Sequence, residues 1–246
     1  MTYCVGMMLR QGLVFMSDTR TNAGLDNIST FKKMTVWDAP GDRVITLLSS
    51  GNLATTQAVV SLLDERTKAH EDRVPTLLGV ASMFQAARLV ADTLREVIEA
   101  HREAGQEADS AFRATLILGG QIAGGAPRLF LVYPEGNFIE ASADTPFFQI
   151  GETKYGRPIL VRAYDPEMSF ATAMKLLLVS FDSTLKANLS VGAPFDYHFY
   201  RTDTLVAGPQ GRIEIDDPYF REIGDGWGEA LRVALDGLRD FAPDRG

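Results

Sequence analysis

The first twenty residues, MTYCVGMMLRQGLVFMSDTR (residues 1–20), decide the fold that the rest of the chain must accommodate. Two apolar runs flank the turn-like Gln11-Gly12 pair, and this pattern predicts a β-hairpin. Because paired antiparallel strands bring sequence-distant ends together, the hairpin is expected to place Thr2 near Asp18.

Thr2 follows the initiator methionine directly, which gives this residue a possible chemical role. If Met1 is removed, Thr2 carries both a hydroxyl and a free α-amine. An α-amine has an ordinary pKa of roughly 7.7 to 8.0, so it can accept a proton from the hydroxyl near neutral pH. The residue would then hold a nucleophile together with its own base.

Composition narrows the class of protein. A hydrophobic content of 46% over 246 residues is enough for a sizeable core, and we expect one domain over residues 1–246. The formal charge of -8 argues against nucleic acid or an anionic membrane as the main partner. Cys4 is the only cysteine, which excludes an intrachain disulfide and favours a cytoplasmic protein. We find neither an apolar run long enough to span a bilayer nor the features of a signal peptide.

Periodicity predicts strands, two helices, strands, two helices, strands and a last helix. The expected strands are 2–8, 13–17, 36–37, 43–49, 114–118, 128–133, 137–141, 147–150, 196–201, 204–207 and 212–215. The expected long helices run from about 53 to 63, 76 to 102, 169 to 185 and 218 to 241. A short helix is expected to be opened or bent at Pro158. We expect the strands before residue 50 to form one sheet and those from residue 114 onward a second. This order predicts two antiparallel sheets covered by helices on the outside, and it argues against a doubly wound parallel fold.

Three further residues are candidates for the chemistry of Thr2. A lysine, either Lys32 or Lys33, would favour the developing alkoxide, and Asp18 would orient that lysine. The Gly51 N–H, at a strand-to-helix junction, would point at an oxyanion. Taken singly, each residue has an ordinary structural explanation, such as a turn residue, a solvated lysine or a helix start. It is the occurrence of all of these residues together, in this order along the chain, that favours a catalytic site.

The segments that carry these residues resemble the proteasome-type N-terminal nucleophile (Ntn) hydrolases. The matching stretches are Thr2, SDTRTNAG (17–24), FKKM (31–34) and SGN (50–52), in the same order as in proteasome β-subunits. The opening MTYCVG and the run ISTFKK (28–33) are most similar to the bacterial branch called Anbu, the ancestral β-subunit. The resemblance implies an α+β fold, a four-layer α-β-β-α sandwich.

The resemblance also implies roles for individual residues. Thr2 would be the nucleophile, Asp18 and Lys33 its catalytic partners, and Gly51 the oxyanion donor. The loop 19–24 would bind substrate, with Asn22 and Thr21 against the peptide backbone. No metal and no cofactor are implied.

Two positions depart from the family pattern. Family members carry a serine after the glycine matched to Gly151, where this chain has Glu152. They also place an aspartate three residues before a serine. Ser190 matches that serine, but Ala187 stands at the aspartate position.

Other candidate sites are weaker. Cys4 lies in an apolar strand, where a free cysteine behaves as a small core residue. His70, His101 and His198 lack metal-ligand spacing. The run GDGWG (224–228) has no preceding strand, so we interpret it as a turn or a helix interruption rather than a nucleotide-binding loop.

The leading hypothesis is a self-assembling, ring- or spiral-forming threonine hydrolase acting on peptides or other amides. One alternative is a small-molecule amidase or transferase on the same fold. Another is an oligomeric scaffold with little or no activity, which Glu152 and Ala187 favour. No feature of the sequence identifies a partner ATPase.

Overall fold

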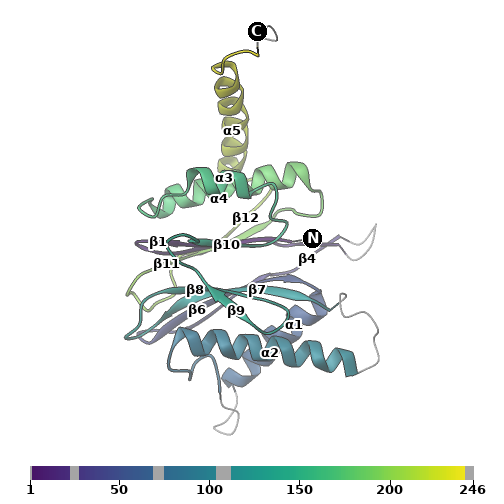
Figure 1. The fold of residues 1–246 in the computed structure, drawn as a ribbon, viewed down its shortest axis with the longest axis vertical. Coiled ribbons are helices and arrows are strands. Elements are labelled where there is room, and N and C mark those ends of the chain that lie inside the picture. Colours follow the sequence, from purple (N-terminus) through teal and green to yellow (C-terminus); the bar gives the residue numbers. More distant parts are fainter. Residues whose placement is uncertain (1, 23–27, 69–74, 104–111, 242–246) are drawn as a thin grey trace, which may run out of the picture.

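The computed structural model describes residues 2–22, 28–68, 75–103 and 112–241, with the side chains of 22, 28 and 101–103 left out. Two β-sheets lie face to face, with α3 and α4 on the outer face of one and α1 and α2 on the outer face of the other (Figure 1). The predicted four-layer α+β sandwich is therefore confirmed.

The sheet that carries the opening hairpin has the strand order β10-β1-β2-β11-β12, and all of its pairs are antiparallel. Its strands are β1 (Tyr3–Leu9), β2 (Gly12–Asp18), β10 (Phe147–Gly151), β11 (Phe195–Arg201) and β12 (Gln210–Ile213). Helices α3 (Arg157–Ala163) and α4 (Phe170–Ala187) cover it. Both faces of β1 and β2 are buried, which explains their nearly continuous apolar sequence.

The second sheet has the order β5-β6-β7-β8-β9 and is also antiparallel. Its strands are β5 (Met34–Ala39), β6 (Arg43–Gly51), β7 (Ala114–Ile122), β8 (Arg128–Val132) and β9 (Phe138–Glu140), and helices α1 (Leu53–Lys68) and α2 (Met83–Glu103) cover it. A separate ribbon of β3 (Arg20–Asn22) and β4 (Ile28–Thr30) lies in the segment between β2 and β5.

The predicted membership of the two sheets was wrong, although the predicted opening hairpin was right. β5 pairs with β6 and β6 with β7, so neither joins the sheet of the opening hairpin, and β10 pairs with β1. Turn residues determine which neighbouring strands form a hairpin, whereas sheet membership depends on where the chain crosses between layers. The chain crosses in the segment around the β3–β4 ribbon, and crosses back before β10.

Two smaller predictions also fail. Residues 204–207 form no strand, because Asp203 (φ +64°) and Leu205 (φ +48°) turn the backbone there. The run 224–228 does not interrupt the helix but lies inside α5 (Pro218–Asp236). A Cβ on Gly224 would lie 2.8 Å from Asp182 Oδ1, so this glycine allows α5 to approach α4 closely. Tertiary contact thus overrides the low helix propensity of glycine.

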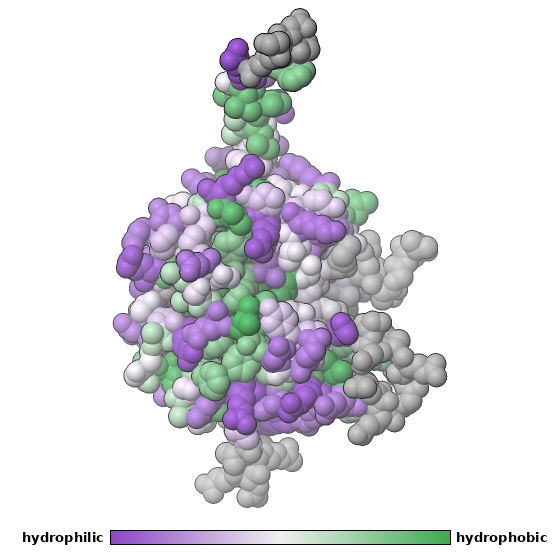
Figure 2. Space-filling model, in the orientation of Figure 1, coloured by the Kyte–Doolittle hydropathy of each residue, from purple (hydrophilic) through white to green (hydrophobic). Residues whose placement is uncertain are grey.

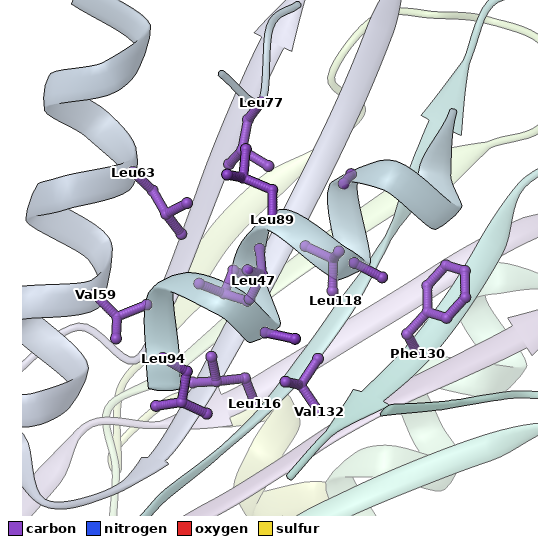
Figure 3. Packing of buried hydrophobic residues seen from close by; sticks show 14 of the residues in the cluster. Leu47, Val59, Leu63, Leu77, Leu89, Leu94, Leu116, Leu118, Phe130 and Val132 are labelled. Atoms are coloured by element: carbon purple, nitrogen blue, oxygen red, sulfur yellow. The ribbon is translucent and has the colours of Figure 1, made fainter. Parts of the chain in front are cut away.

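Apolar side chains fill three zones, one under each helical layer and one between the sheets. Figure 3 shows the zone under α1 and α2, where Val59, Leu63 and Leu94 meet Leu47 and Leu116 of the sheet. The zone between the sheets contains the buried ring of His198, whose Nδ1 lies 2.8 Å from Thr46 Oγ1. Burial lowers the pKa of His198 to about 4, so its ring is neutral at pH 7.

Candidate active site

Thr2 lies at the N-terminal end of β1, directly before its first paired residue, and its side chain is buried. The Glu152 N–H donates to the Thr2 carbonyl oxygen at 2.7 Å, which extends the β1–β10 ladder by one residue. Gly151 makes this possible: its φ is +83°, and a Cβ there would lie 1.9 Å from the Thr2 oxygen. Met1 lies outside the described residues.

Asp18 and Lys33 form a buried ion pair beside Thr2. Lys33 Nζ lies 2.7 Å from Asp18 Oδ1 and donates also to the Arg20 carbonyl oxygen at 2.6 Å. The N–H of Tyr3, the residue after Thr2, donates to the same Asp18 oxygen at 3.0 Å. Asp18 thus lies near Thr2, as predicted, but its hydrogen bond is to the backbone N–H of Tyr3, the next residue, and not to Thr2 itself.

Burial raises the pKa of the Asp18 carboxyl, while Lys33 and the Tyr3 N–H act in the opposite direction. The side chain of Asp18 is fully buried and that of Lys33 is 6% exposed, so each charge depends on the other for compensation. Lys32, by contrast, is exposed. Of the two lysines, only Lys33 is held by the carboxylate that the site requires.

Gly51 closes β6, where its φ of +123° excludes other residues without strain. The Ser49 N–H donates to the Lys33 carbonyl oxygen and the Asn52 N–H to Arg113 on the opposite side. N–H directions alternate along a strand, and Ser50 is still paired with β7, so the Gly51 N–H lies on the same side as that of Ser49. This is the side from which Lys33 approaches Thr2.

A cavity of about 530 Å³ joins these groups. It is lined by Thr2, Thr21, Lys32, Lys33, Ser49, Ser50, Gly51, Asn52, Leu53, Thr56 and Gly151. Residues from β1, β3, β6, β10 and the start of α1 therefore meet at one opening between the two sheets. The volume suits a few residues of an extended peptide or a small amide.

The other predicted site residues are Asn22 and Ser190. Asn22 is on β3, one residue after Thr21, and its side chain lies outside the described part of the chain. Ser190 is in the turn after α4, where its N–H donates to Asn188 Oδ1 at 2.9 Å. Ser190 is not one of the described residues that line the cavity.

A chain of hydrogen bonds connects Thr2 to Asp18 through the turn after α4. Glu152, whose N–H holds the Thr2 carbonyl, accepts at Oε2 from Asn188 Nδ2 at 2.9 Å. Asn188 Oδ1 holds the turn through Ser190, and further along the turn the Gly192 N–H lies 3.4 Å from Asp18 Oδ2. Since Asp18 accepts from Tyr3, the chain of contacts returns to the residue bonded to Thr2.

Sequence reasoning missed Asn188 and Arg20 as parts of this arrangement. Arg20 Nη1 donates to the Leu189 carbonyl oxygen at 2.9 Å, and a Cβ on Gly192 would overlap the Arg20 guanidinium. Arg20 therefore packs the turn after α4 against β3. The only sequence signal was its place in the motif SDTR; nothing near Asn188 pointed to a contact with Glu152.

The weaker candidates gain no support. Cys4 is fully buried between the sheets, and burial raises the pKa of its thiol. His70 lies outside the described residues, and so does the side chain of His101. Over the described ranges, no cluster of three or more His, Cys, Asp or Glu side chains is arranged to hold a metal. No described helix has the length and apolar character needed to cross a bilayer.

The fold is that of a proteasome-like protein of the Ntn-hydrolase type, and comparison with known families agrees. The family model "Proteasome subunit" matches residues 2–195, and the chain belongs to this family. No curated protein matches the chain.

Several similar solved structures belong to one branch of the family, Anbu. Anbu from Yersinia bercovieri is 48% identical, with a TM-score of 0.90, and the match covers 98% of this chain and 99% of that one. A Gly-1 mutant of Anbu from Hyphomicrobium sp. strain MC1 is 51% identical, with a TM-score of 0.91, covering 98% and 100%. The helical assembly of the Anbu complex from Pseudomonas aeruginosa is 43% identical, with a TM-score of 0.92, covering 99% and 100%. The resemblance to the Anbu branch is thus confirmed.

Proposed function

We propose that the protein is an N-terminal threonine hydrolase that cleaves amide bonds through an acyl-enzyme. The observation that carries this proposal is the buried Asp18–Lys33 pair at the cavity that also contains Thr2 and Gly51. An ion pair of this kind, next to the first residue of a strand, suits a nucleophile located at a chain terminus.

The reaction begins once the bond between Met1 and Thr2 has been hydrolysed. The Thr2 hydroxyl oxygen attacks the substrate carbonyl carbon, and its proton passes to the Thr2 α-amine, directly or through one water. The Lys33 ammonium stabilises the developing alkoxide, and the Gly51 N–H stabilises the oxyanion. The protonated amine then gives its proton to the leaving nitrogen, and the C–N bond breaks. A water hydrolyses the resulting ester, releasing a carboxylic acid and restoring Thr2.

Self-assembly is part of the proposal. The Pseudomonas aeruginosa relative forms a helical assembly, and this chain carries an amphipathic helix that projects from the fold and exposes apolar side chains. A ring or spiral of copies would place several cavities in one particle. The substrate is a peptide or another amide.

Intact-mass analysis of the purified protein, with and without a threonine-directed electrophile, tests the mechanism. We expect a mass that lacks Met1 and one adduct per chain, localised to Thr2. Thr2→Ala should abolish labelling, and Thr2→Ser, which keeps a hydroxyl, should retain it. Equal labelling of the Thr2→Ala variant would contradict the proposal, as would a mature protein that retains Met1. If the electrophile labels Thr2 but only small amides are turned over, the amidase alternative is favoured.

A further inference from the structure

The charge of the Thr2 cavity is unusual for a protein with a net charge of -8. Two lysines line the cavity, and none of the described residues in its lining carries a carboxylate. Lys33 is neutralised by Asp18, which lies behind it. Lys32 is exposed and has no ion pair within 4.0 Å among the described residues. Of the charged side chains in the described lining, Lys32 is therefore the one without an ion-pair partner among the described residues.

Most of the other described lining residues are polar. Thr21, Ser49, Thr56 and Asn52 are among them, and Leu53 is the one aliphatic side chain among the described lining residues. A group with oxygen acceptors would meet donors and a cation.

Lys32 lies where its side chain can contact a substrate bound in the Thr2 cavity. It precedes Lys33 directly, and its side chain also borders a second cavity of about 650 Å³ along β5, β11 and β12. That second cavity contains Asp38, and also Asp196, which is paired with Arg212. These acidic groups line the second cavity and are not in the described lining of the Thr2 cavity.

We propose that the site selects substrates with a carboxylate on the acyl side of the scissile amide, as in a peptide cleaved after glutamate or aspartate. Lys32 is the specificity-determining residue, and its ammonium binds that carboxylate. This inference rests on the proposed threonine hydrolase, and it adds the substrate class to it.

The test uses peptide electrophiles that are identical except for the side chain next to the reactive group, which is Glu, Gln or Leu. Glu and Gln have nearly the same shape, so the ratio of their Thr2 labelling rates isolates the effect of charge. We expect Glu to label about fivefold faster than Gln, since an exposed ion pair contributes up to about 1 kcal/mol. The ratio should fall as salt is added.

Substitutions of Lys32 test whether this residue causes the preference for Glu over Gln. Lys32→Met should bring the Glu:Gln ratio to about one, and Lys32→Glu should reverse the preference. Lys154→Met, which makes the same change of net charge at an exposed lysine outside the cavity lining, should keep the wild-type ratio. A wild-type ratio of one or less, or a ratio that survives Lys32→Met, would overturn the substrate assignment alone. Failure of all three probes to label Thr2 would overturn the hydrolase proposal with it.

Discussion

At the scale of single residues, Glu152 connects the nucleophile to the rest of the site. Its N–H holds the Thr2 carbonyl and its carboxylate accepts from Asn188, the residue next to Ala187. The two departures from the family pattern are therefore neighbours in space. The carboxylate that the family pattern places at the end of α4 is here supplied from the end of β10.

This exchange predicts that Glu152 positions Thr2. Glu152→Ala removes the acceptor for Asn188 and loosens the turn that reaches Asp18, and we expect Thr2 labelling to slow by about 100-fold. The double variant Glu152→Ser, Ala187→Asp restores the family arrangement and should recover most of the rate. Labelling kinetics, followed by intact mass, measure both. Glu135→Ala, at an exposed glutamate, is the control for charge. Wild-type labelling by the Glu152→Ala variant would contradict this role.

At the scale of elements, the ends of strands place the chemistry. Thr2 precedes β1, Asp18 ends β2, Lys33 precedes β5 and Gly51 ends β6. Each lies at or next to the end of a strand, where Thr2, Lys33 and Gly51 line the cavity and Asp18 is buried against Lys33, while the strand interiors stay apolar. Such positions could be predicted from sequence because a change from apolar to polar residues is a local signal.

The sequence was less informative about contacts between distant segments. The order of layers followed from periodicity, but the pairing of β10 with β1 did not, because 140 to 148 residues separate the partners in the register. The contact between Glu152 and Asn188 joins a strand end to a helix end and has no periodic signature. The continuity of the helix through 224–228 was missed because Gly224 packs closely against α4, which propensity does not report.

The end of β10 offers a test with a closely matched control. Gly151 and Gly41 both have a φ of +83°, but a Cβ at Gly41 meets no atom within 4 Å. Gly41→Ala should cost about 1 kcal/mol of unfolding free energy for its left-handed backbone and leave Thr2 labelling unchanged. Gly151→Ala has the same backbone penalty and also collides with the Thr2 carbonyl oxygen, so it should lose more stability and most of its labelling. Denaturant unfolding and labelling kinetics measure the two effects; equal behaviour of the variants would show that Gly151 does not set the position of Thr2.

At the scale of the whole molecule, α5 does not pack along the body of the fold. It leaves the surface beside α4 and projects away from it (Figure 1), and Figure 2 shows apolar side chains along its projecting part. Only Phe220 and Gly224, near its start, are buried. The exposed apolar side chains farther out are Leu231, Val233, Leu235, Leu238 and Phe241, with exposed fractions of 49% to 89%. A mostly apolar groove of about 750 Å³ lies at the base of the helix, against α3 and α4.

A projecting amphipathic helix with exposed apolar side chains gains stability when another surface covers them, and a second copy of the chain is the partner that self-assembly supplies. Leu231→Glu combined with Leu235→Glu, one helical turn apart, should therefore convert an oligomer into a monomer at micromolar concentration. Arg232→Ala, on the same helix, changes a polar exposed residue and should leave the oligomer intact. Light scattering measures the mass, and circular dichroism checks that the sandwich stays folded. Because the helix lies on the side of α4 opposite the sheets, Thr2 labelling should persist in the monomer. An unchanged oligomer in the double glutamate variant would show that copies meet through another surface.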